Sequence, residues 1–163
     1  MCDPNILLIA KLLFMKSTMQ NTEALNDLIE INNDRVEGYN KASVQTSDED
    51  LRSLFAKFAT QSNQFAGELR QRVMAEGDEP EEGTTIRGKI YRAWMGVKAT
   101  FSGKDRKSVL ESCEFGEDAA QRAYQSALEE DDLSSDVRQL LEQQKATLRE
   151  AHDKVKKLRD AQL

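Results

Sequence analysis

The sequence has few residues that interrupt helices or cross-link a chain: two prolines, eight glycines and two cysteines among 163 residues. Proline and glycine are the strongest helix breakers, so their scarcity leaves room for long uninterrupted helices. Two cysteines do not make a disulfide framework, and Cys2 and Cys113 fit the reducing conditions of the cytoplasm. We therefore expect a cytoplasmic helical protein rather than a secreted disulfide scaffold.

An excess of positive charge is also absent. Lys and Arg number 23 against 29 Asp and Glu, which gives a net charge of −6. Nucleic-acid binding depends on Lys and Arg that displace counterions from phosphates, so no nucleic-acid partner is expected. The sequence also has no phosphate-binding glycine loop, zinc-ligand spacing or nucleophile elbow. It therefore predicts no catalytic residues, no cofactor and no particular small-molecule ligand.

Long hydrophobic runs are missing as well. The longest apolar stretch, ILLIAKLLF at Ile6–Phe14, is interrupted by Lys11 and is less than half of the roughly 20 residues that cross a bilayer as a helix. It lacks the basic start and the cleavage site of a signal peptide. We expect residues 1–20 to be a loose extension or a mis-assigned start, with Met15 and Met19 as alternative starts. A partner-docking or membrane-surface helix is the alternative, although membrane contact is not expected. Residues 21–163 are predicted to form one domain.

Apolar residues recur at spacings of three and four through four long stretches, with no alternating apolar and polar segment. This periodicity predicts an all-α domain. Ser47–Asp50 resembles a capping box at the start of the second stretch, and Gly77 is expected to end it. The predicted helices are Thr22–Val44, Asp48–Ala75, Arg106–Glu130 and Ser135–Asp160.

The links between these stretches predict the topology. Short polar links join the first helix to the second and the third to the fourth, which favours two antiparallel pairs. The long link between the pairs contains an amphipathic segment, Ile86–Phe101, which we expect to form a short accessory helix. Two antiparallel pairs joined by a long crossover are the ferritin-like four-helix arrangement. A faint internal repeat supports it, because a shift of 85 positions moves Leu25 onto Leu110 and Asn32 onto Glu117.

Four segments together resemble a bacterial family of four-helix-bundle proteins assigned to the ferritin-like group, a domain of unknown function. The resemblance spans about residues 22–160 and implies a fold without an established activity. The segments are LNDLIEINNDRVEGY (Leu25–Tyr39), KIYRAWM (Lys89–Met95), GKDRKSVLESCEFGEDAAQRAY (Gly103–Tyr124) and AHDKVKKLRD (Ala151–Asp160).

The ferritin-like group includes di-iron and di-manganese proteins, in which two helices each supply a Glu and two others each supply Glu-x-x-His. Only Glu117 and His152 match this pattern. Where the remaining ligands are expected, the sequence has Asn32, Gln61, Gln64 and Arg149. A metal-binding protein or oxidase holding Fe or Mn therefore remains the alternative function. Its candidate ligands are Glu37, Glu114, Glu117 and His152.

Glu117 stands on the apolar stripe of the third helix, where a carboxylate is costly unless it is paired or hydrogen-bonded. We predict that it joins a buried polar layer that fixes helix register, with Asn32, Gln61, Gln64 or a tyrosine hydroxyl as its partner. On this reading, the substitution Glu117→Gln keeps or raises stability. The leading function is a non-catalytic binding or structural bundle, and analogy within the fold group suggests a stress-related role.

Basic residues cluster in the crossover around the single tryptophan. They form a candidate interaction surface that could bind an anion, although pairing with the acidic bundle or with a neighbouring subunit is the simpler interpretation. A homodimer is one outcome of such pairing. The residues of this surface are Arg87, Lys89, Arg92 and Trp94.

Overall fold

The computed structural model describes residues 3–83 and 105–162, which form a bundle of four helices with no β-strand in that part of the chain. The predicted all-α, ferritin-like bundle is confirmed. The accessory helix expected at 86–101 and the basic surface around Trp94 lie outside the described residues. The helices are α1 (Pro4–Gln45), α2 (Glu49–Ala75), α4 (Arg106–Leu128) and α5 (Ser135–Asp160).

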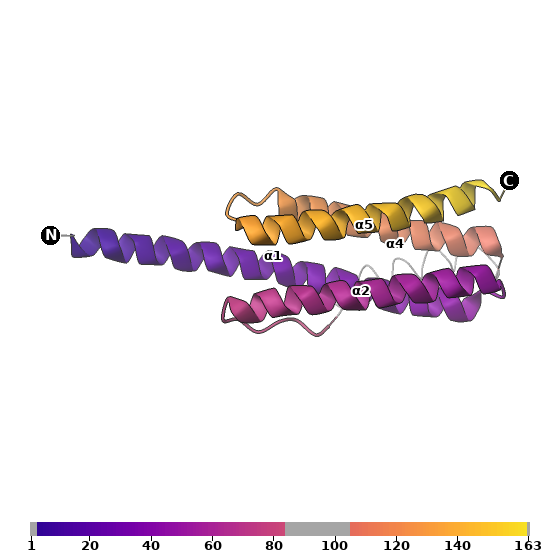
Figure 1. Ribbon diagram of the computed structural model, residues 1–163, viewed down its shortest axis with the longest axis horizontal. Helices are drawn as coiled ribbons and strands as arrows, with labels where there is room; N and C mark the ends of the chain where they lie inside the picture. The colour runs from indigo at the N-terminus through magenta and orange to yellow at the C-terminus, as the bar shows by residue number, and fades with distance from the viewer. Residues whose placement is uncertain (1–2, 84–104, 163) are drawn as a thin grey trace.

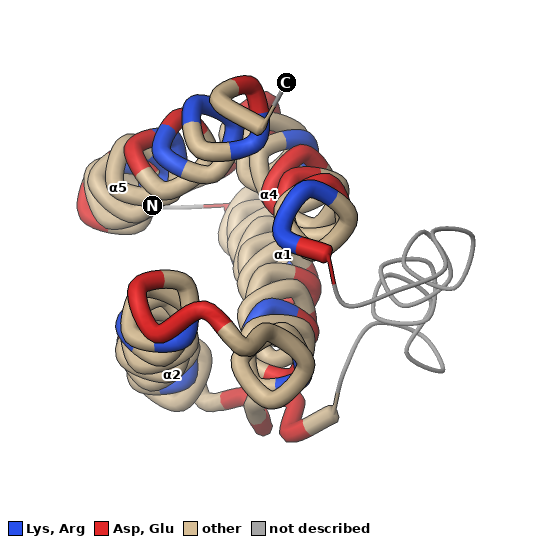
Figure 2. The backbone as a smooth tube through the Cα atoms, turned by 90° about the vertical axis from the view of Figure 1, so that its right-hand side faces the viewer, with Lys and Arg blue, Asp and Glu red and all other residues tan. Residues whose placement is uncertain are grey.

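The helices form two antiparallel pairs, α1 with α2 and α4 with α5 (Figure 1). α2 ends at one end of the bundle, and α4 begins at the other (Figure 1). Figure 2, which looks along the bundle, shows α1 beside α2 and also beside α4. This is the up–down–down–up order that one long crossover produces.

Local sequence explains most of the helix ends. Ser134 Oγ accepts a hydrogen bond from Val137 N at 3.3 Å, and Asp105 Oδ1 accepts one from Ser108 N at 3.0 Å, so both residues cap helices. Gly77 follows α2 with φ of +82°, as expected for the residue after a helix end. The predicted capping box at 47–50 does not form, because Asp48 is the N-cap residue and makes no capping bond with its side chain.

The largest difference from expectation is at the start of α1. The helix begins at Pro4 instead of Thr22, so residues expected to be loose are helical and project beyond the bundle (Figure 1). Proline is tolerated in the first helical turn, and the leucines, methionines and lysines that follow are good helix formers. Even with this extension, none of the described helices is long and apolar enough to cross a membrane.

The core is divided along the bundle axis into two apolar clusters. The first lies toward the projecting end and includes Leu25, Leu28, Ile29, Phe65, Leu69, Tyr124, Leu141 and Leu148. The second lies toward the opposite end and includes Tyr39, Leu51, Phe55, Phe58, Leu110, Cys113 and Val155. On α1, α2 and α4, the polar residues Arg35, Ser62 and Glu117 separate the two clusters and are almost completely buried.

Candidate functional site

A buried ion pair lies at the centre of the bundle. Arg35 Nη2 of α1 is 2.6 Å from Glu117 Oε1 of α4, and the two side chains are 1% and 0% exposed. Arg35 Nη1 donates to Ser62 Oγ of α2, and the Tyr39 hydroxyl donates to the same Glu117 oxygen. Two charges in the core therefore meet through a charge-assisted hydrogen bond that neighbouring polar groups support.

Aromatic packing holds this pair on one side. The Arg35 guanidinium lies 5.3 Å from the centre of the Tyr39 ring, within the range of a cation–π interaction. The Tyr39 ring in turn packs against Phe55 at 5.5 Å and Phe58 at 5.3 Å between centroids. The ion pair is thus enclosed by aromatic side chains of α1 and α2.

The electrostatics favour one fixed protonation state. Burial by itself lowers the pKa of Arg35, but the charge of Glu117 and its hydrogen bond raise that pKa above its ordinary value. Burial and the charge of Glu117 raise the pKa of Tyr39 well above its usual range, so its hydroxyl stays a proton donor at neutral pH. The same two causes raise the pKa of the Cys113 thiol, which is therefore a poor nucleophile.

A second chain of hydrogen bonds continues the polar layer toward α5. Asn32 Nδ2 donates to the Tyr124 hydroxyl at 2.8 Å, which donates to Gln144 Oε1 at 2.7 Å. Gln144 Nε2 donates to Glu68 Oε2 at 2.8 Å, which brings in α2. Together the two networks connect all four helices, and we call them the central polar layer: Asn32, Arg35, Tyr39, Ser62, Glu117, Tyr124 and Gln144.

The internal repeat is visible in these contacts. The 85-position shift that moves Asn32 onto Glu117 also moves Tyr39 onto Tyr124. In space, Tyr39 of α1 bonds to Glu117 of α4, and Tyr124 of α4 bonds to Asn32 of α1. Each tyrosine therefore reaches across to the repeat-related polar residue of the other helix, as an approximate two-fold relation between the pairs requires.

The structure does not bring the four metal candidates together. Glu117 is in the central polar layer, whereas Glu37 is exposed and Glu114 pairs with Arg159. His152 is 6% exposed, but its Nε2 contacts Asp118 at 3.0 Å and its Nδ1 contacts Asp153 at 2.9 Å. Within the described ranges, no group of three or more His, Cys, Asp or Glu side chains could hold a metal ion.

The structure places the residues of the predicted polar layer at different depths. Asn32 and Glu117 are fully buried, and a tyrosine hydroxyl does bond to Glu117. Gln61 is half-buried and is not seen to bond to Glu117, while Gln64 is exposed and bonds to Glu68 instead. α2 turns Ser62 inward, so the two glutamines flank the layer residue rather than forming the layer.

Sequence reasoning missed Arg35, the cation of the site. It lies three positions after Asn32 and four before Tyr39, which is the spacing of the buried stripe, but arginine is rarely buried, so a search for apolar residues at that spacing passes over it. Arg149 stands where the di-metal pattern expects a glutamate. It is exposed and pairs with Asp153 at 3.1 Å, so it faces away from the core.

The residues around Glu117 do not fit a two-metal centre. Metal pairs of the ferritin-like type take several carboxylates and imidazoles, whereas the partners of Glu117 are the guanidinium of Arg35 and the phenol of Tyr39. A guanidinium 2.6 Å from the carboxylate would also repel a dication. One acceptor remains open, because Glu117 Oε2 has no hydrogen-bond partner among the described residues.

Two solved structures share the fold. A mutant of Dps1 from Mycobacterium smegmatis superposes with a TM-score of 0.76 at 14% identity, covering 88% of this chain and 97% of that chain. A ferritin-like diiron-carboxylate protein from Bacillus anthracis str. Ames gives a TM-score of 0.60 at 14% identity, covering 87% of this chain and 94% of that chain. Identities this low establish the fold alone.

Sequence comparison identifies the family. No curated protein matches the sequence. The model of a family described as a domain of unknown function (DUF2383) matches residues 20–130, which is more than half of the chain. The chain therefore belongs to this family, as its sequence motifs predicted.

Proposed function

We propose that this protein is a non-catalytic ferritin-like bundle with a structural or binding role, and that the Arg35–Glu117 pair takes the place of a metal centre. The observation that carries the proposal is the 2.6 Å contact between two almost fully buried charges at mid-bundle. In di-metal bundles, inward-facing glutamates from different helices meet in the core around the metals. Here a protein cation neutralises the one inward glutamate of α4.

The state of the candidate reactive groups supports a non-catalytic role. Tyr39 and Cys113 are fully buried, and their raised pKa values keep both protonated at neutral pH. The surface pockets between α1 and α4, and between α4 and α5, are not lined by Arg35, Tyr39 or Glu117. A substrate in one of these pockets would not contact the central polar layer. The buried free thiol of Cys113 also agrees with a cytoplasmic location.

Metal loading tests the proposal. The purified protein is loaded anaerobically with Fe(II) or Mn(II), desalted, and measured for metal by mass spectrometry. We expect far less than one metal ion per chain, and the same low value in Glu117→Gln. Glu142→Gln, which removes an exposed carboxylate of α5, serves as the matched control. Near-stoichiometric metal that is lost in Glu117→Gln and retained in Glu142→Gln would contradict the proposal.

That contrary result would establish the alternative, a metal-binding ferritin-like protein or oxidase. Two observations favour the alternative: the open Glu117 Oε2 acceptor and the fold shared with a diiron-carboxylate protein. Because Glu117→Gln can fail to fold, the double variant Arg35→Met/Glu117→Gln is measured beside it. The double variant removes the carboxylate without leaving a buried charge unpaired, so lost metal binding there cannot be attributed to unfolding.

A further inference from the structure

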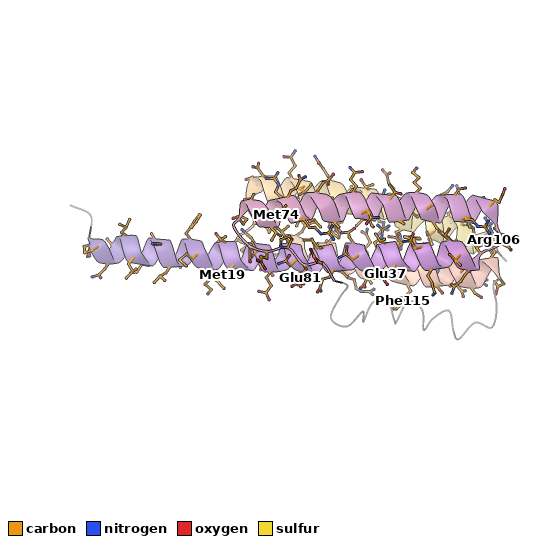
Figure 3. All side chains as sticks on the ribbon, turned by 90° about the horizontal axis from the view of Figure 1, so that it is seen from below. Met19, Glu37, Met74, Glu81, Arg106 and Phe115 are labelled. Atoms are coloured by element: carbon orange, nitrogen blue, oxygen red, sulfur yellow. The ribbon has the colours of Figure 1, made fainter. Side chains whose placement is uncertain are left out.

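The projecting first part of α1 carries an unusual apolar surface. Nine large apolar side chains are each 51% to 72% exposed, and Figure 3 shows side chains standing out from both sides of this segment. We call residues 4–19 the projecting segment. At 100° per residue these positions lie all around the helix, a distribution typical of a helix that is covered by other protein. The nine residues are Ile6, Leu7, Leu8, Ile9, Leu12, Leu13, Phe14, Met15 and Met19.

The exposed area is that of a protein interface. With roughly 100 Å² for each of the nine side chains, the segment presents on the order of 900 Å² of apolar surface. A typical monomer shows no apolar patch above a few hundred Å², whereas each partner in a standard interface buries about 800 Å². The segment therefore exposes more apolar surface than a monomer usually does, which indicates a surface that contacts other protein.

The bundle itself has a groove of complementary character between α1 and α4. The lining residues that are buried or half-buried are all apolar and form its floor: Ala24, Leu28, Ala123 and Ala127. Its rim is acidic, with Glu23 and Asp27 on one side and Glu130 on the other, and none of the three makes an ion pair with a described residue. Burial and the nearby charge of Glu23 raise the pKa of Asp27, as expected for carboxylates crowded together without cations. The only cations of the projecting segment are Lys11 and Lys16.

The segment cannot fill the groove of its own molecule. α1 is one continuous helix from Pro4 to Gln45, so the segment points along the bundle axis and away from the groove (Figure 1). A second copy of the chain, however, offers a segment and a groove at once. In an antiparallel pairing, Lys16 beside Glu23 has its midpoint at position 19.5 and Lys11 beside Asp27 at position 19, so both pairs share one two-fold axis near Met19.

We propose that the protein is a two-fold dimer in which the projecting segment of each chain docks in the α1–α4 groove of the other. Lys11 and Lys16 meet the acidic rim, and the leucines and isoleucines cover the alanine-rich floor. Met19 lies where α1 leaves the bundle, so the axis passes between the ends of the two bundles (Figure 3). The dimer does not depend on the central polar layer, so it stands or fails separately from the function proposed above.

A membrane surface fits the segment less well than a second copy. A helix that lies on a bilayer has one apolar face and a basic opposite face, whereas this segment is apolar on all sides and has two lysines. The net charge of −6 also opposes approach to an anionic lipid surface.

Sedimentation equilibrium of the full chain tests the dimer through a charge exchange. We expect the wild type at twice 18.5 kDa. Lys11→Glu/Lys16→Glu is expected to weaken dimerisation by at least about tenfold, because it places like charges on the acidic rim. Adding Glu23→Lys/Asp27→Lys to the same chain reverses both sides of each pair and restores the affinity. Val44→Asp, at an 83% exposed apolar position near the other end of α1, is the control that leaves the dimer intact.

Three results would overturn the dimer. The first is a wild-type monomer at tens of micromolar. The second is a dimer that persists in Lys11→Glu/Lys16→Glu, or a dimer affinity that stays weak when Glu23→Lys/Asp27→Lys is added to that variant. The third is a monomer that sediments with vesicles of phosphatidylcholine and phosphatidylglycerol, which would assign the segment to a lipid surface.

Discussion

The buried pair of Arg35 and Glu117 makes a sharp prediction about stability. Arg35→Met and Glu117→Gln are each expected to destabilise the fold strongly, while the double variant is expected to regain most of the loss. Either single change leaves one charge in a site that is at most 1% exposed, without its opposite charge. Methionine approximates the arginine stem, and glutamine keeps an oxygen that can accept from Tyr39.

The magnitude follows from burial. Two unit charges about 4 Å apart attract by about 4 kcal/mol at an effective dielectric constant of about 20. Removing one member of a buried ion pair costs about 3–5 kcal/mol, whereas replacing both is often nearly neutral. For a chain of this length, 1 kcal/mol corresponds to about 2–4 °C, so each single variant should melt roughly 6–20 °C lower. The double variant should lie within about 2 kcal/mol of wild type, because Ser62 still loses its donor.

Urea unfolding of the four proteins, followed by circular dichroism, measures the double-mutant cycle. Dimerisation makes the measured stability depend on protein concentration, so all four proteins are compared at one concentration. The expected coupling is several kcal/mol, with the two single losses far from additive. Additive losses, or a Glu117→Gln protein as stable as wild type, would refute the reasoning. The sequence alone predicted that Glu117→Gln keeps or raises stability; the guanidinium 2.6 Å away reverses that sign.

Three further predictions follow from single contacts. Tyr39→Phe removes a buried donor to Glu117 and should lower the free energy of unfolding by about 1–3 kcal/mol, measured in urea; no change would argue against that hydrogen bond. The hydrogen bond from Arg106 lowers the pKa of Asp50 from 3.8 to about 2, so its contribution is full above about pH 4 and is lost as the pH falls toward 2. The melting difference between wild type and Arg106→Gln should therefore shrink over that interval, and a constant difference would count against the pair. In a Cys2→Ser background, Cys113 should react with a thiol reagent only as the protein unfolds, since burial raises its pKa; rapid reaction of the native protein would show that the site is open.

The fold could be predicted from the sequence because it depends on long helical periodicity and on the lengths of the links between helices, and few other folds share both. The stripes of α2, α4 and α5 repeat at helical spacing over more than twenty residues each, and the predicted bounds lie within two residues of those observed. α1 was the exception, since its first eighteen residues lack a stripe that faces the bundle. Helix propensity alone extends the helix through these residues. Because they do not pack on the bundle, they carry no periodic apolar pattern from which the extension could be predicted.

The site could be predicted only in part, because it depends on which of two adjacent residues turns inward. Glu117 and Asn32 interrupt apolar stripes and were therefore visible, and the repeat correctly related them. Arg35 and Val36 fit the helical period almost equally well. Valine is buried far more often than arginine, so residue type favours Val36, although Arg35 is the residue that turns inward. Arg35 turns inward because it pairs with Glu117 on another helix. The sequence of α1 alone gives no sign of that partner. Gln144 was missed for the same reason, since its partner Tyr124 lies on α4.

Anomalous diffraction from crystals grown with Mn(II) tests the central claim most directly. The proposed replacement of the metal centre predicts no anomalous peak beside Glu117, with the Arg35 guanidinium still bonded to the carboxylate. A manganese peak on Glu117, with Arg35 turned away, would contradict the claim and establish a carboxylate metal site.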